Sequence, residues 1–171
     1  MSKKMQIKIR RFRKKDINSI RNIAHHAFDT ATDKYWSVIG ALRAPRVLVA
    51  EKFGKIVGVI EFEAYRLTGS VEGHIWYIFV HPRCQRMGIG SKLLARAENI
   101  MMKEGAQRFW AITGEDNTAT RKFFEKNGYR EVSVEGMKKL LGGRNTKKFL
   151  RRMVYWEGDV IYMKKAKKRE T

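Results

Sequence analysis

The sequence predicts an α/β protein with a mixed, mostly antiparallel sheet of about six or seven strands and helices on the faces of the sheet. Three observations support this prediction. Short apolar runs typical of strands alternate with segments whose apolar residues recur at helical spacing. Three strand-like runs in the first half follow one another with no helix between them, which favours antiparallel pairing. No internal repeat is visible, and 171 residues fit a single domain.

The first part of the chain predicts a strand, a helix and a β-hairpin. Residues 5–10 alternate apolar and polar side chains as a strand does, and Asp16 can cap the helix that follows. The polar, aromatic stretch after this helix predicts no regular element. Residues 47–50 and 56–65 are the expected hairpin strands, with Gly54 in the turn. The helix is read from one apolar stripe, formed by Ile17, Ile20, Ile23, Ala24, Ala27 and Phe28.

The middle of the chain predicts a buried strand that leads into a long helix. Residues 74–80 are rich in β-branched and aromatic residues, and apolar side chains on both faces indicate a central strand. Pro82 ends this strand. From Gly88 to about Gly105 the apolar residues recur at helical spacing, as Ile89, Leu93, Leu94, Ala97, Ile100 and Met101.

The last part of the chain predicts short strands and one further helix. Residues 109–113 have the composition of a strand, and Asp116 or Asn117 can cap the helix after it. Residues 129–134 and 160–163 predict the last two strands.

The basic charge is concentrated at the two ends of the chain. Of 37 Lys and Arg against 17 Asp and Glu, residues 1–15 carry a net +8 and residues 137–171 a net +9. We therefore divide the chain into a core at 5–136, a basic insertion at 137–153, and a final strand with a basic tail at 154–171. Basic ends on a nearly balanced body suggest a polyanionic partner, such as RNA or an acidic protein, although a solvated basic surface fits the same composition.

The composition also excludes several classes of protein. The single cysteine, Cys84, excludes a disulfide framework and fits a reducing compartment. No apolar run approaches the roughly 20 residues of a membrane span. His25, His26 and His81 have no cysteines or carboxylates at metal-binding spacing. We therefore expect a cytoplasmic protein with neither a membrane segment nor a metal site.

The segment between the central strand and the long helix is the most informative one. It reads Val-His-Pro-Arg-Cys-Gln-Arg-Met-Gly-Ile-Gly-Ser-Lys over residues 80–92. Gly88 and Gly90 let the backbone approach a ligand, and the amides from Gln85 to Ser91 lie at the positive end of the helix dipole. These amides suit an anion such as a pyrophosphate, although a plain strand-to-helix turn uses glycines in the same way.

Two segments resemble motifs of the GNAT N-acetyltransferase superfamily. Gln85-x-x-Gly88-x-Gly90 after a Val-His-Pro strand end resembles the family's acetyl-CoA motif, and residues 117–129 are similar to its second motif. The resemblance implies one N-acetyltransferase domain over 1–171, with a V-shaped opening between the central strands. It also implies direct transfer of an acetyl group from acetyl-CoA to a protein N-terminus, a lysine or a small amine. The alternative is a catalytically silent CoA-binding or RNA-binding module on the same fold.

The resemblance further implies where acetyl-CoA binds. The pyrophosphate is expected on the amides of residues 85–91, and the pantetheine beside the backbone of residues 79–80. Basic side chains near both motifs are candidates for the remaining phosphate charge, with a surface cation as the alternative for each; Arg121 is one of them. The expected cofactor-binding residues are Phe79, Val80, Gln85, Arg86, Met87, Gly88, Ile89, Gly90, Ser91, Lys92, Asn117, Phe124 and Lys126.

His74 is the main candidate for the catalytic base. Many relatives carry a glutamate at this place, eleven residues before Gln85. A histidine with an ordinary pKa of about 6.5 accepts a proton at neutral pH, although a structural histidine at the strand edge fits as well. Glu63 and Glu72 are the alternatives, each acting through a water.

Phe124 departs from the family pattern. Many relatives have a tyrosine there that protonates the leaving thiolate, and phenylalanine has no proton to give. Water, Tyr77 or Tyr129 would then supply the proton, or activity is reduced. Since the family's amine attacks the thioester directly, we expect Cys84 to be no nucleophile.

Overall fold

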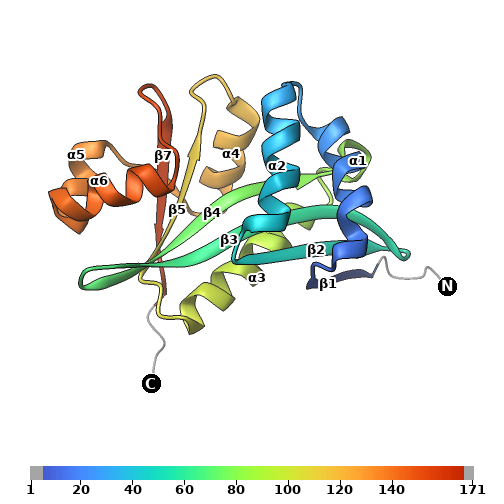
Figure 1. Ribbon diagram of the computed structural model, residues 1–171, viewed down its shortest axis with the longest axis horizontal. Coiled ribbons are helices and arrows are strands. Elements are labelled where there is room, and N and C mark those ends of the chain that lie inside the picture. Colours follow the sequence, from blue (N-terminus) through green and yellow to red (C-terminus); the bar gives the residue numbers. More distant parts are fainter. Residues whose placement is uncertain (1–5, 168–171) are drawn as a thin grey trace. The chain divides into compact units, whose positions relative to one another are not determined.

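The structure, a computed structural model, describes residues 6–167 (Figure 1). Seven strands form a mixed sheet in the order β1-β2-β3-β4-β5-β7-β6, with helices packed against it, which confirms the predicted fold class. The chain divides into two compact units, Met1–Glu63 with Trp76–Asn99, and Ala64–Ile75 with Ile100–Thr171. Met5, which opens the predicted first strand, and the outermost basic residues Lys3, Lys4, Lys168 and Arg169 lie outside the described residues.

The first unit contains the predicted helix and hairpin, together with the long helix. Strand β2 pairs antiparallel with both β1 and β3. Val59 on β3 packs in a core with residues of α1 and α2, whereas a side chain at the neighbouring Gly58 would meet Ile89 and Leu93 of α3. Since successive strand residues point to opposite faces, α1 and α2 cover one face of these strands and α3 the other. Strands β3 and β4 and helix α3 contribute residues to both units. In chain order, the elements up to the end of α3 are β1 Ile7–Arg11, η1 Lys14–Asp16, α1 Ile17–Ala27, α2 Ala31–Arg43, β2 Arg46–Lys52, β3 Lys55–Leu67, β4 Ser70–Val80, η2 Pro82–Cys84 and α3 Ile89–Lys103.

The second unit is built around strand β5. Residues Glu72–His74 of β4 pair in parallel with Arg108–Trp110 of β5, and β7 pairs antiparallel with both β5 and β6. Trp110 and Phe149 are fully buried in the core of this unit. The elements that follow α3 are β5 Arg108–Thr113, α4 Thr118–Lys126, β6 Arg130–Glu131, α5 Val134–Leu141, α6 Gly143–Arg152 and β7 Val160–Lys165. No helix within residues 6–167 is long and apolar enough to cross a membrane.

The polar, aromatic stretch that predicted no element forms helix α2. Thr30 caps this helix, because its hydroxyl accepts a hydrogen bond from the Asp33 amide at 3.0 Å and donates one to the Asp33 carboxylate at 2.6 Å. The buried face of α2 is made of the small residues Ser37, Gly40 and Ala41. A face of small residues gives the sequence little apolar periodicity. The helix could have been predicted only from Thr30-x-x-Asp33, a pattern typical of a helix N-terminus.

The predicted strand at 129–134 is wrong after Glu131. The Ser133 hydroxyl accepts a hydrogen bond from the Gly136 amide at 3.0 Å and so caps α5. The basic insertion at 137–153 then contains most of α5 and all of α6, separated at Gly142, whose φ is 79°. The two helices form because each has an apolar stripe that packs on the sheet, including Met137 and Phe149.

Asp16 precedes α1 as predicted, but its side chain does not cap that helix. The carboxylate accepts hydrogen bonds from the Arg10 guanidinium at 2.7 and 3.0 Å and from the Arg13 amide at 2.7 Å. The hydrogen bond from Arg10 is the main reason why the pKa of Asp16 is lowered. The ion pair with the first strand therefore takes the oxygens that a helix cap would use.

Candidate functional site

The turn between β4 and α3 is shaped by hydrogen bonds around Gln85. The Gln85 side-chain amide donates to the carbonyl of Val80 at 3.2 Å, and its backbone amide donates to the carbonyl of Pro82 at 3.3 Å. The Arg83 amide donates to Nδ1 of His81 at 3.3 Å. These bonds tie the end of the strand to the short helix η2, so the backbone direction just before α3 is set locally.

Two residues in this turn adopt the left-handed conformation. The φ angles are 60° at Arg86 and 74° at Gly88, and such a value is strained for any residue but glycine. Helix α3 begins at Ile89, and the Lys92 amide donates to the carbonyl of Gly88 at 3.0 Å. The backbone amides of the three residues before Lys92 lie in the first turn of the helix and have no hydrogen-bond acceptor within it. They therefore offer donors at the positive end of a helix of fifteen residues, a suitable site for an anion.

The other cofactor candidates of the first unit differ in exposure. The Phe79 ring is buried in the core, 5.2 Å from the ring of Phe28, and Val80 is buried beside it. Only the backbone of these two residues is therefore suited to contact a ligand. The sulfur of Met87 lies 3.8 Å from the amine of Lys52. The side chains of Arg86 and Lys92 are exposed.

The candidates on α4 belong to the second unit. Asn117 caps this helix by accepting a hydrogen bond from the Thr120 amide at 3.2 Å, and Lys126 is exposed in its last turn. The Phe124 ring is buried between the rings of Tyr129, at 5.1 Å, and Tyr162, at 5.9 Å. Phe124 is thus a core residue of this unit.

Tyr162 is a residue that the sequence did not single out. Its hydroxyl donates to the carboxylate of Glu125 at 2.8 Å and accepts from the guanidinium of Arg121 at 3.3 Å. Burial raises the pKa of Tyr162. The ring of Tyr162 therefore packs on Phe124 in the core, while its hydroxyl is held by two side chains of α4, an arrangement that no local motif predicts.

His74 is buried in the second unit. Its Cα is in register with that of Trp110 on β5, and its ring meets the edge of the Phe149 ring with centroids 5.9 Å apart. Its side chain is buried although it is polar, and its ring packs against the apolar core at Phe149. A side chain held in this way has a defined orientation.

Glu72 lies on the same strand but has protein partners on both carboxylate oxygens. One oxygen accepts from Nε of Arg108 at 2.9 Å and from the Trp110 indole at 2.7 Å, and the other accepts from the Arg108 guanidinium. Its side chain is fully buried, and that of Arg108 is 16% exposed. This arrangement is typical of a structural ion pair, which competes with a role as a base.

We expect Glu72→Gln to destabilise the protein by about 3 kcal/mol or more, because it leaves a largely buried guanidinium without its counter-charge. The measurement is the free energy of unfolding from a urea titration. Glu135→Gln is the matched control, since Glu135 pairs with Lys138 at 3.2 Å on the surface. That exposed pair should contribute less than about 1 kcal/mol. Equal losses in both variants would contradict the structural role of Glu72.

Glu63, the remaining candidate base, lies in the first unit. It is buried, and its carboxylate accepts a hydrogen bond from the Trp76 indole at 2.9 Å. His74 and Glu72, the two candidate bases on β4, therefore belong to the second unit. Glu63 and the turn before α3 belong to the first unit.

Glu61 is a buried acid that the sequence reading passed over. Among the described residues neither of its carboxyl oxygens has a hydrogen-bond partner, and burial raises its pKa to about 9. A β-carbon at Gly40 of α2 would come within 2.0 Å of this carboxyl, so the glycine makes room for it. Its position within the otherwise apolar run 56–62 is the feature of the sequence that could have predicted a buried acid.

The stability of the protein should fall as the pH rises from the ordinary Glu value of 4.5 towards 9, because folded Glu61 keeps a proton that the unfolded chain releases. The expected loss is at most about 1.4 kcal/mol for each pH unit in this range. Glu61→Gln should remove this dependence and stabilise the protein at alkaline pH. Urea titrations at several pH values test this, with Glu157→Gln as an exposed control. Parallel pH profiles for the parent and Glu61→Gln would refute it.

Comparisons with known proteins agree with the fold and with the predicted family resemblance. Residues 15–129 match the acetyltransferase (GNAT) family. An uncharacterised N-acetyltransferase of Methanocaldococcus jannaschii is 29% identical over 133 residues, which cover 72% of this chain and 78% of that protein. One of Bacillus subtilis is 32% identical over 89 residues, covering 50% of this chain and 58% of that protein.

A solved structure shows the same fold at low sequence identity. The PaiA N-acetyltransferase of Thermoplasma acidophilum, in complex with coenzyme A, superposes with a TM-score of 0.70 at 18% identity, over 94% of this chain and 99% of that one. The family match spans both motifs that the sequence predicted to be GNAT-like, and it confirms the predicted resemblance. This chain belongs to the acetyltransferase (GNAT) family of acyltransferases.

Proposed function

We propose that this protein transfers the acetyl group of acetyl-CoA directly to a primary amine of a protein N-terminus, a lysine or a small molecule. The observation that supports this most is the turn before α3, with left-handed Arg86 and Gly88 and the first amides of a long helix. These amides suit a pyrophosphate, which acetyl-CoA carries. The coenzyme A complex of the PaiA enzyme from Thermoplasma acidophilum supports the same co-substrate.

In the proposed reaction the amine nitrogen attacks the thioester carbonyl, a C–N bond forms and the C–S bond breaks. His74 takes the proton that the amine loses, since a neutral imidazole accepts a proton near neutral pH. The first amides of α3 hold the pyrophosphate, with Arg86 and Lys92 as neighbouring cations. No covalent enzyme intermediate is involved, which leaves Cys84 without a catalytic role.

The leaving thiolate also needs a proton. Phe124 cannot supply it, and burial raises the pKa of Tyr77 to about 12, which makes that phenol a weaker acid than a free tyrosine. We assign the proton to water, because a thiol with an ordinary pKa of about 8.5 is a fair leaving group without a positioned acid. A positioned acid typically contributes about 10² to 10⁴ in rate, so we expect a modest turnover.

The experiment is an assay of free thiol released from acetyl-CoA with a panel of amines: peptides with a free N-terminus, peptides with one lysine, and small amines. Alcohols of matched size are the controls. Thiol release that depends on the amine, with the acetylated amine detected by mass spectrometry, is the expected result. Binding of acetyl-CoA without such release from any amine would favour the silent module that the loss of an acid at Phe124 suggests.

A further inference from the structure

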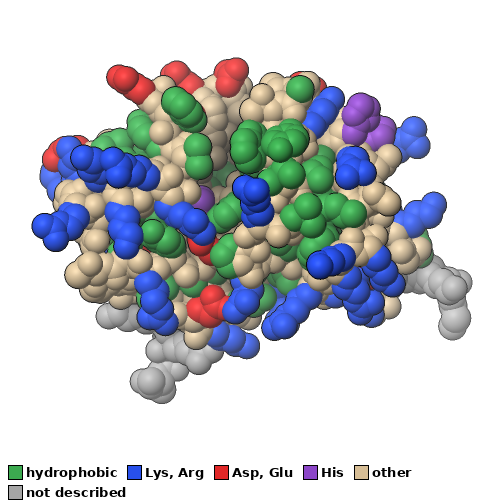
Figure 2. All heavy atoms as spheres, viewed as in Figure 1, with side chains coloured by type: hydrophobic (Ala, Val, Ile, Leu, Met, Phe, Trp, Pro, Cys, Tyr) green, Lys and Arg blue, Asp and Glu red, His purple; other side chains and the backbone are tan. Residues whose placement is uncertain are grey.

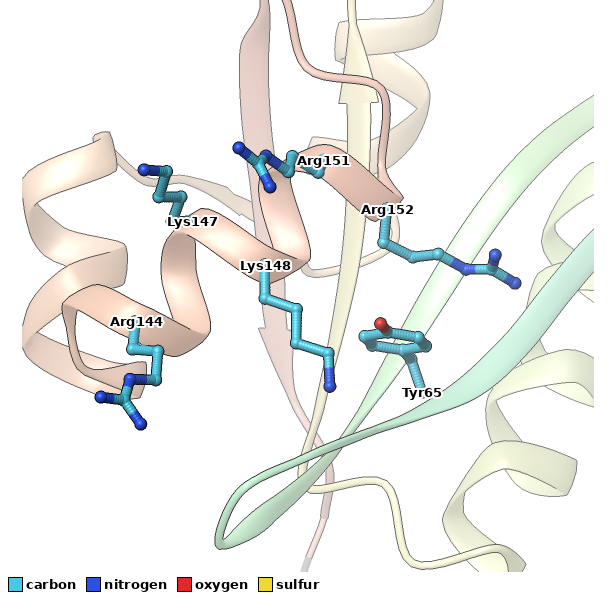
Figure 3. A pocket seen from close by; sticks show the side chains of 6 residues that line it. All are labelled: Tyr65, Arg144, Lys147, Lys148, Arg151 and Arg152. Atoms are coloured by element: carbon cyan, nitrogen blue, oxygen red, sulfur yellow. The ribbon is translucent and has the colours of Figure 1, made fainter.

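Helix α6 carries five cations on one face. Arg144, Lys147, Lys148, Arg151 and Arg152 follow one another at intervals of three and one residues, which keeps them on one side of a helix. The opposite side holds the buried Thr146 and Phe149. Figure 2 shows basic side chains gathered over this part of the molecule, and Figure 3 shows the five leaving the same helix. The stripe is about 12 Å long at the rise of 1.5 Å per residue.

Three of these five cations have no ionic partner among the described residues. Arg144, Lys147 and Arg151 have no ion pair with any residue in 6–167, and all three are exposed. Like charges at helical spacing repel each other and weaken the helix. The macrodipole favours cations in the last turn but disfavours Arg144 in the first. Arg144 and Lys147 therefore gain nothing from an ion pair or from the helix dipole, which favours a role for these cations in binding.

The stripe lines an open pocket of about 540 Å³ together with Tyr65 of β3 (Figure 3). The amine of Lys148 and the guanidinium of Arg152 lie 5.6 and 5.4 Å from the centre of the Tyr65 ring. Tyr65 stacks on Phe149 with ring centres 5.7 Å apart and planes at 9°. We call this site, lined by Tyr65 and the five cations, the α6 pocket.

The α6 pocket lies close to the candidate base. Phe149 contacts both Tyr65 and His74, with a distance of 5.9 Å between the centres of the His74 and Phe149 rings. A single aromatic ring thus separates the pocket wall from His74. This proximity fits a site that holds the acceptor while its amine reacts.

We propose that the α6 pocket binds acidic side chains of a peptide or protein acceptor whose amine is acetylated; this inference rests on the proposed transferase function. Three or four extended residues span about 12 Å, the length of the stripe. The same charges repel cationic acceptors such as polyamines. RNA fits less well, because Tyr65 is stacked on Phe149 and flanked by two cations, which leaves no open ring for a base.

The test uses three peptides with the same free N-terminus and the same single lysine, followed by about four glutamates, glutamines or arginines. We expect kcat/KM to be roughly tenfold or more higher for the glutamate peptide than for the glutamine peptide, and lowest for the arginine peptide. The preference should weaken as salt is added. Anisotropy of the labelled peptides measures their binding independently of turnover.

The variant combines Arg144→Gln, Lys147→Gln and Arg151→Gln, and leaves Lys148 and Arg152 on Tyr65. The control has the same change in charge at exposed positions of α2 and α3: Arg43→Gln, Arg96→Gln and Lys103→Gln. We expect the variant to lose the preference for glutamate with its KM for acetyl-CoA unchanged, and the control to keep both.

Binding and turnover separate the two proposals. If the glutamate peptide binds through α6 but neither the peptides nor any amine of the panel is acetylated, the transferase proposal fails while binding of acidic peptides by the pocket stands. Equal binding of the glutamate and glutamine peptides by the parent overturns the pocket proposal. So does an RNA oligonucleotide that binds through α6 while the peptides show no preference by charge.

Discussion

Replacing Gly90 with valine should abolish the stabilisation of this protein by acetyl-CoA. Gly90 is the second residue of α3, where the proposed pyrophosphate site needs the backbone amides to be uncovered. A branched side chain in the first turn would occupy the space of the phosphates. A ligand at about 100 times its Kd stabilises the folded state by about 2.7 kcal/mol, and the variant should lose this. Thermal unfolding with and without acetyl-CoA measures the effect.

Gly143→Val is the matched control for this experiment. Gly143 is the first residue of α6, and a β-carbon there would meet nothing within 4 Å. It places the same side chain in the first turn of a different helix, so it should leave the acetyl-CoA shift intact. A folded Gly90→Val protein that keeps the full shift would remove the turn before α3 as the phosphate site.

Replacing His74 with alanine should lower kcat by about 10² to 10⁴ with little change in the KM for acetyl-CoA, because a positioned base acts in the transition state and does not hold the cofactor. Steady-state rates with a fixed amine and varied acetyl-CoA separate the two constants. His25→Ala, an exposed histidine on α1, is the control and should behave like the parent.

Glu63→Gln provides the decisive comparison. If it abolishes turnover while His74→Ala stays active, the base is Glu63. Glu72→Gln is less informative about catalysis, because its ion pair with Arg108 makes a loss of stability the expected outcome. The unfolding free energy of each variant therefore has to be measured with its rate.

The sequence alone determined the elements whose side chains repeat with a strong local period. The apolar stripe of α3, the hairpin of β2 and β3 around Gly54, and the Asn117 cap of α4 all follow from interactions between residues close in the chain. The turn before α3 belongs to the same class, since its glycines and helix start are local features. The family could be read from that turn and from residues 117–129 for this reason.

The tertiary structure decided which distant residues meet. The sequence reading missed α2 because its buried face consists of small residues, and it missed α5 and α6 because their basic residues obscure two narrow apolar stripes. Glu61 is made unusual by its burial opposite Gly40, a contact between β3 and α2. Glu72 finds Arg108 through the parallel pairing of β4 with β5, 36 residues away in the chain.

The α6 pocket shows the same division between local pattern and distant contact. The sequence showed a basic segment, but only the fold brings it to Tyr65 on β3 and, through Phe149, near His74. The spacing of charges along a helix is a local property that the sequence encodes directly. Which surface those charges face depends on the packing of Phe149 into the core, and burial free energy is gained only when segments far apart in the chain come together.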